Sequence, residues 1–204
     1  MWLLHKGQIH VSAGVCLLLG WFVLVNGWRL AGLVLSAAAL HELGHYVVLR
    51  LLGVRISVLR ISVFGAEMTA GGDALSYAGE LAAVLAGPAM NLLAGVALAE
   101  AGYLSAAGAH LVLCAFNLLP VRPLDGGRAL YLLVSWAMGP TAGETVCRWM
   151  GGCTALFLAT ALVWLMVRSG GSLWLLPAAG PGAAVLCLPG TSYRLRRGTA
   201  AEPL

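Results

Sequence analysis

The amino-acid sequence predicts an all-α polytopic membrane protein with about six transmembrane helices and a short membrane-associated β-hairpin. Composition is the first reason: of 204 residues, 60% are hydrophobic and 10% are charged, and the mean hydropathy is +0.90. Soluble domains carry roughly 25% charged residues, so this chain is too apolar to be one. The spacing of the apolar runs and one segment of alternating residues are the other two reasons.

The apolar runs give the expected order of the helices. Runs long enough to cross a bilayer lie at 9–27, 29–52, 78–100, 104–121, 145–167 and 172–189, with a shorter helical stretch at 126–138. We expect a single transmembrane domain over residues 1–190. A basic tail that we expect to be disordered follows over residues 191–204.

Positive charge predicts the orientation of these helices. If Lys6 is cytoplasmic, only Arg29 and Arg168 fall on the opposite side of the membrane. The cell-membrane protein would then have both termini in the cytoplasm. The net charge of +4 comes from residues scattered over loops and span ends, which argues against nucleic-acid binding. Five cysteines without C-x-x-C spacing argue against a disulfide or zinc framework.

Residues 54–70 interrupt the helical pattern. Apolar and polar residues alternate along this segment, and the alternation slips by one position between Val58 and Leu59. Such a pattern predicts two short strands joined by a turn or bulge. We expect either a surface loop on the bilayer or a strand edge that pairs with an extended peptide.

The stretch HELGH at residues 41–45 carries the chemistry. His41 and His45 are four residues apart, so on a helix they face the same side and can share one metal ion. Glu42 lies beside that face, where it can act on a metal-polarised water. Three polar side chains in a membrane-spanning run are costly, so we expect an interior metal site and not a surface accident.

A catalytic zinc takes three protein ligands, so a third must come from elsewhere in the chain. The other candidates are Asp73, Asp125, His5, His10 and His110. We favour Asp125, because prolines and glycines around it predict an unwound backbone that is tolerated at an interior site. A helix-capping role for Asp125 is the alternative. We expect His110 to be an interfacial histidine with no metal.

Three ordered motifs resemble the site-2 protease family of intramembrane zinc metalloproteases. These motifs are HELGH at 41–45, AGPAMN at 86–91, and Asn117 with Pro120 and LDGG at 124–127. The sequence is most similar to the branch that contains stage IV sporulation protein FB. The resemblance implies a metalloendopeptidase that carries out regulated intramembrane proteolysis of a membrane-associated protein, such as a sigma or anti-sigma factor.

The resemblance also implies roles for individual residues. It makes Glu42 the catalytic base and His41, His45 and Asp125 the ligands of one zinc ion. Asn117 would position substrate or stabilise the oxyanion. The hairpin would bind the substrate segment, and we expect contacts from Arg55, Ser57, Ile61 and Phe64. Residues that shape the site would be Gly87, Pro88, Asn91, Pro120, Pro123 and Gly126.

Two other functions compete with a protease. A metal-ion transporter also uses polar groups at broken helices, but it gains nothing from a glutamate beside the two histidines. A metal-binding scaffold without proteolytic activity would keep the same ligands and cut nothing. The oligomeric state is not predicted by any of these patterns.

Overall fold

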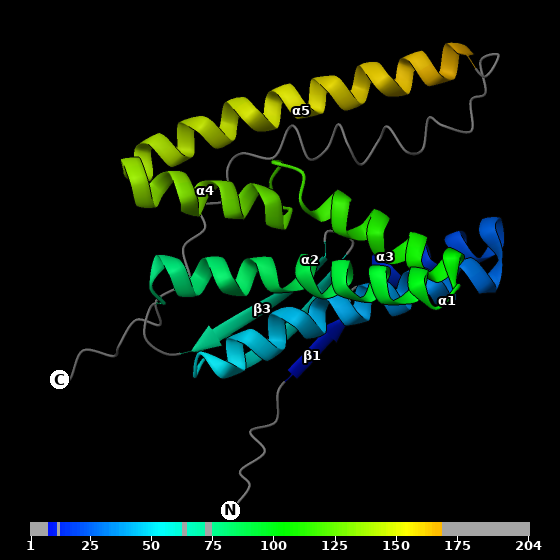
Figure 1. Ribbon diagram of the computed structural model, residues 1–204, viewed down its shortest axis with the longest axis horizontal. Helices are drawn as coiled ribbons and strands as arrows, with labels where there is room; N and C mark the ends of the chain where they lie inside the picture. Colours follow the sequence, from blue (N-terminus) through cyan, green and yellow to red (C-terminus); the bar gives the residue numbers. More distant parts are fainter. Residues whose placement is uncertain (1–7, 12, 63–64, 72–74, 169–204) are drawn as a thin grey trace, which may run out of the picture. The chain divides into compact units, whose positions relative to one another are not determined.

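The computed structural model describes residues 8–11, 13–62, 65–71 and 75–168 (Figure 1). The chain forms two compact units that divide between Cys114 and Ala115. In order, the elements are β1 (Gln8–Val11), α1 (Ala13–Leu51), β2 (Arg55–Ser62), β3 (Gly65–Gly71), α2 (Tyr77–Glu100), α3 (Leu104–Asn117), α4 (Asp125–Met138) and α5 (Pro140–Arg168). The expected tail over 191–204 and the apolar run at 172–189 lie outside the described residues.

Helix α1 contains two of the predicted apolar runs. It is interrupted at Gly27, whose backbone is not helical (φ 79°, ψ 160°), so two helical segments meet there. Glycine suits this point because it has no Cβ to oppose a positive φ. The first run was predicted to begin at residue 9, and this is wrong. Residues Gln8–Val11 alternate polar and apolar side chains and form β1.

About six membrane crossings are predicted for the whole chain, and one of them, the run at 172–189, lies outside the described residues. In the described part of the chain, three helical stretches are long and apolar enough to cross a membrane: Gly14–Leu51, Tyr77–Glu100 and Pro140–Arg168. Helices α3 and α4 have 14 residues each. At 1.5 Å per residue such a helix spans roughly 21 Å, which is short of a hydrocarbon core of about 30 Å.

Short connections set the ends of the remaining helices. Ser76 caps α2 by accepting a hydrogen bond from the backbone N–H of Gly79 at 3.2 Å. Gly102, at φ +83°, lies in the turn between α2 and α3. Pro140 begins α5, a position that suits proline because the first helical N–H needs no partner. The predicted run at 145–167 therefore begins earlier than expected.

The strands form a three-stranded sheet in the order β1-β2-β3. β1 pairs with β2 in parallel and β3 pairs with β2 antiparallel, so among the described residues β2 is the central strand. The register of β2 and β3 shifts between Ile56 and Val58. The predicted slip between Val58 and Leu59 is therefore misplaced by about one position. The additional residue of β2 that causes this shift lies between Ile56 and Val58, because the pairing is regular from Val58 onward.

Small residues dominate the buried side chains within each unit, while many large apolar residues are exposed. The fully buried apolar residues include Ala37, Ala83 and Ala107, whereas Leu24 is 83% exposed and Trp28 is 75% exposed. This distribution is typical of helices that pack through small residues and turn their large side chains toward lipid. Helices α1 and α2 of the first unit pack closely in this way (Figure 1). An added Cβ on Gly44 would lie 2.6 Å from the carbonyl oxygen of Ala86.

Candidate metal centre

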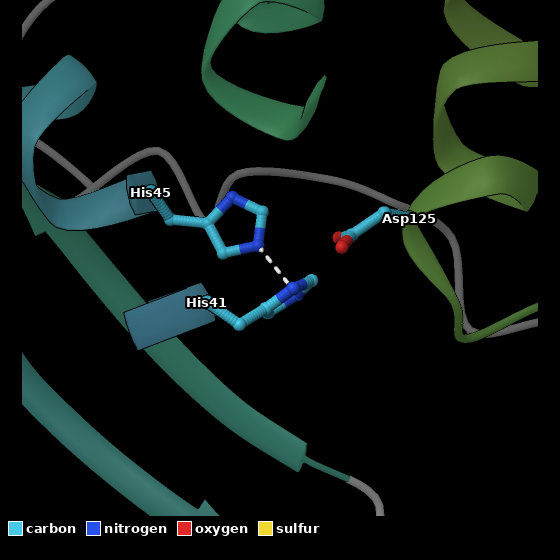
Figure 2. A group of neighbouring side chains, drawn as sticks. All are labelled: His41, His45 and Asp125. Carbon is cyan, nitrogen blue, oxygen red and sulfur yellow. Dashed lines mark hydrogen bonds between the residues drawn. The ribbon is translucent and has the colours of Figure 1, made fainter. Parts of the chain in front are cut away.

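Two histidines on α1 point their ring nitrogens at each other. His41 Nε2 and His45 Nε2 are 3.1 Å apart, and the ring planes meet at 81° (Figure 2). Two nitrogens bound to one tetrahedral zinc at about 2.05 Å would lie roughly 3.3 Å apart. The separation of the two nitrogens and their chemical type therefore fit a shared zinc ion.

A backbone carbonyl fixes the protonation pattern of His45. Its Nδ1 donates a hydrogen bond to the carbonyl oxygen of Ala83 on α2 at 2.8 Å. A carbonyl can only accept, so Nδ1 carries the proton and the neutral ring has its lone pair on Nε2. Metal-binding histidines are commonly oriented by such a bond from their other nitrogen.

His41 contacts Asn91 on α2, and Asn91 in turn contacts His110 on α3. Asn91 Nδ2 on α2 lies 3.2 Å from His41 Nδ1, and Asn91 Oδ1 lies 3.0 Å from His110 Nδ1 on α3. The exposed fractions of the three side chains are 5% for His41, 0% for Asn91 and 5% for His110. The His110 ring is buried among the helices of the first unit and bonded to Asn91. Its expected position at the membrane interface stays a prediction.

Gly87 faces the histidine pair from α2. A Cβ at this position would touch His45 Nε2 and would lie 2.8 Å from His41 Nε2. Gly87 is itself buried. Any side chain here would occupy the space beside both nitrogens, so this glycine keeps that space open.

Glu42 follows His41 on α1 and is partly buried. Consecutive helical residues lie about 100° apart, so Glu42 is beside the face that carries the two histidines. Its carboxylate is the one acidic group within the HELGH stretch. The catalytic role assigned to it from the sequence remains a prediction.

Asp125 is the first residue of α4 in the second unit, and it is partly buried. A carboxylate is favourable at this position because it meets the positive end of the helix dipole. Because Gly126 and Gly127 have no Cβ, the loop before Asp125 packs closely against the start of α4. A Cβ on Gly126 would lie 2.6 Å from the carbonyl oxygen of Leu119, and a Cβ on Gly127 would lie 2.7 Å from the carbonyl carbon of Val121.

The same loop is tied to α5 within the second unit. Arg122 donates two hydrogen bonds to Glu144, at 2.9 Å to Oε1 and 2.7 Å to Oε2. The backbone between Asn117, which ends α3, and Asp125 contains Pro120 and Pro123 and is not helical. The expected interruption of the helix before Asp125 is therefore present.

His41 and His45 on α1 of the first unit offer two ring nitrogens to one metal ion (Figure 2). Asp125 belongs to the second unit, and its role as the third ligand stays a prediction. Three of the four residues expected to contact substrate belong to the sheet. Arg55, Ser57 and Ile61 belong to the central strand β2, and Phe64 lies outside the described residues. Sequence reasoning gave His110 no role. Its place 19 residues after Asn91, on the next predicted helix, was the only available signal.

Comparisons with known proteins agree with this arrangement. Zinc metalloprotease MJ0392 of Methanocaldococcus jannaschii is 30% identical over 139 residues, which cover 62% of this chain and 40% of that protein. Rip3 of Mycobacterium tuberculosis, named as a candidate zinc metalloprotease, is 36% identical over 115 residues, which cover 48% of this chain and 29% of Rip3. The chain thus spans less than half the length of these relatives. No family model matches it.

The fold has a solved counterpart. The site-2 protease from Methanocaldococcus jannaschii superposes with a TM-score of 0.62 at 21% sequence identity, covering 93% of this chain and 95% of that one. The fold is therefore that of a site-2 protease. Together with the sequence similarity and the His41–His45 pair, it relates this chain to the zinc metalloproteases of the site-2 protease type.

Proposed function

We propose that this chain is an intramembrane zinc metalloprotease that hydrolyses a peptide bond of a membrane-associated protein. The facing Nε2 atoms of His41 and His45, 3.1 Å apart on a membrane-spanning helix, carry this proposal. The Nδ1 atoms of these two imidazoles contact Ala83 and Asn91, and these contacts orient both Nε2 atoms so that they can bind one cation.

In this proposal His41, His45 and Asp125 hold one zinc ion. Two imidazole nitrogens and one carboxylate are a ligand set typical of catalytic zinc, which leaves a fourth position open. When bound, zinc polarises a carbonyl and lowers the pKa of a water molecule toward neutrality. Gly87 keeps the space beside the two nitrogens free of any side chain.

Glu42 serves as the general base and then passes its proton to the leaving amine. Its place beside the ligand face of α1 supports this role, since a base must reach the attacking water without occupying a ligand position. Asn117, at the end of α3 and just before the unwound stretch, offers an amide that can bind the substrate backbone or the oxyanion.

The substrate we propose is an extended segment of a membrane-associated protein, such as a sigma or anti-sigma factor, cleaved near the cytoplasmic leaflet. A protease needs an unwound peptide, and a strand edge can hold one by main-chain hydrogen bonds. Among the described strands, β3 has one neighbour, whereas β2 is paired on both sides over Val58–Ile61. The outer edge of β3 therefore suits this role better than β2.

The experiment that tests the proposal combines metal content with cleavage. Wild type, His41→Ala, Glu42→Gln and Glu100→Gln are purified in detergent, their zinc is measured, and a single-span model substrate is added. Glu100 is an exposed residue at the end of α2 and serves as the matched control. We expect about one zinc per chain in all except His41→Ala.

Cleavage separates the protease from the other two functions. Glu42→Gln removes only the proton acceptor, so it should keep zinc and lose about 10²- to 10⁴-fold in rate. Zinc binding with cleavage that is equal in wild type and Glu42→Gln would contradict the assigned role. Zinc binding with no cleavage of any single-span substrate would favour a transporter or a scaffold.

A further inference from the structure

We propose that Asn91 and His110 form a hydrogen-bond relay that selects the tautomer of His41, which makes His110 a positioning residue for the metal centre. This Asn91–His110 relay runs from α3 through α2 to α1, all within the first unit. The inference rests on the proposed function, because it assigns His41 Nε2 to zinc.

Burial makes the hydrogen bonds of the relay energetically important. Asn91 is fully buried, and its amide lies between two imidazole nitrogens at 3.2 Å and 3.0 Å. When a buried amide loses a hydrogen-bond partner, the protein is destabilised by the full desolvation free energy of the unpaired group. The two ends of the Asn91 amide must therefore match the two ring nitrogens in donor and acceptor character.

Two hydrogen-bond orders match the two contacts of the Asn91 amide. In the first, His110 Nδ1–H donates to Asn91 Oδ1, and Asn91 Nδ2–H donates to His41 Nδ1. His41 then carries its proton on Nε2 and donates it to His45 Nε2, which is unprotonated because His45 donates from Nδ1 to Ala83. In this order His41 Nε2 has no lone pair for a metal.

In the second order the Asn91 amide group is rotated so that its Oδ1 and Nδ2 atoms exchange places. Its Oδ1 accepts from His41 Nδ1–H, which leaves the lone pair of His41 on Nε2 for zinc. Its Nδ2 then donates to His110 Nδ1, so the proton of His110 lies on Nε2. Each ring keeps one N–H in both orders, so no net proton is gained or lost.

Zinc binding thus requires the second order, and His110 takes part in it by offering an unprotonated Nδ1. A metal-binding histidine needs an acceptor for its other N–H, and loss of such a partner typically lowers metal affinity 10- to 100-fold. Here the acceptor is an amide, which can turn, and an unprotonated His110 Nδ1 accepts a hydrogen bond from its Nδ2–H in the zinc-binding orientation.

Zinc affinity of paired variants tests the relay. Asn91→Leu removes the amide and should bind zinc about 10- to 100-fold more weakly. Asn91→Asp keeps an acceptor toward His41 Nδ1–H and should bind at least as tightly as wild type. Leu111→Ala is the control, because Leu111 packs against Gly95 of α2 beside the relay but does not belong to it.

A double-mutant cycle shows whether His110 acts through Asn91. His110→Phe should weaken zinc binding in the wild-type background and have no further effect in Asn91→Leu. Equal effects of His110→Phe in both backgrounds would overturn the relay.

Ring tautomers give a readout that a purely structural role would not move. Nitrogen-15 spectra of zinc-loaded, histidine-labelled wild type should show His41 protonated at Nδ1 and His110 protonated at Nε2. A zinc-loaded protein with His110 protonated at Nδ1 would overturn the relay even if Asn91→Leu fails to fold. Absence of zinc binding in wild type would overturn the proposed function, and the relay with it. Zinc binding that is equal in wild type and Asn91→Leu would overturn the relay alone.

Discussion

Gly87→Ala places a methyl group against both histidines of the candidate metal centre. The added Cβ would lie 2.8 Å from His41 Nε2, about 0.6 Å closer than the 3.4 Å at which ordinary van der Waals contact begins, and closer still to His45 Nε2. Overpacking of this kind typically costs about 1–3 kcal/mol. The rings can turn away from the methyl group when no metal holds them, but ligands bound to one ion cannot.

The strain should therefore appear as a loss of metal affinity. A cost of about 1–3 kcal/mol corresponds to roughly 5- to 150-fold weaker zinc binding. We would measure it by competition with a chromophoric chelator on protein purified in detergent. Gly95→Ala is the matched control, since its Cβ would meet the side chain of Leu111, two turns further along α2. Equal zinc affinity in Gly87→Ala, Gly95→Ala and wild type would refute the placement of the metal beside Gly87.

Three other predictions follow from the second unit. Asp125→Asn should lower zinc affinity by at least about tenfold in a chelator competition, and full zinc occupancy in that variant would remove Asp125 from the ligand set. Gly126→Ala should destabilise the protein by about 1–3 kcal/mol in thermal unfolding, because the added Cβ meets loop backbone. Gly152→Ala is the control and should be neutral or slightly stabilising, because the space around Gly152 is open. Equal melting temperatures of the two variants would contradict this packing. Glu144→Gln should cost at most about 1 kcal/mol in the same assay, because the pair with Arg122 is partly exposed, and a larger loss would mean that the pair holds the loop more tightly than its exposure indicates.

Local pattern was enough to predict much of the helical framework. The predicted run at 78–100 corresponds to α2 (Tyr77–Glu100), and the stretch at 126–138 corresponds to α4 (Asp125–Met138). Ser76 and Gly139 mark ends that propensity and capping rules recognise. Hydropathy alone does not give the length of each helix, because the run at 104–121 is apolar over 18 positions but helical only to Asn117.

Features that depend on pairing between distant segments were not predictable in the same way. β1 is too short to stand out beside an apolar run, and it exists because Gln8–Val11 can pair with Val58–Ile61, about 50 residues later. The boundary between the predicted runs at 9–27 and 29–52 coincides with the kink at Gly27, but the sequence does not show that the two segments join in one helix.

The polar groups around the metal centre show why a motif predicts ligands better than it predicts what orients them. His41 and His45 are neighbours by helical spacing, so their meeting follows from local geometry. Asn91 and His110 meet because α2 and α3 pack against one another, with Gly95, one turn after Asn91, making room for Leu111, the residue after His110. A buried histidine surrounded by alanine and leucine looks in sequence like an interfacial one, because burial is a property of the packed helices and not of the residues that flank it. The pairing of a fully buried amide with two imidazoles is costly unless every bond is made. That cost is a physical reason to look for function at such a residue when no motif contains it.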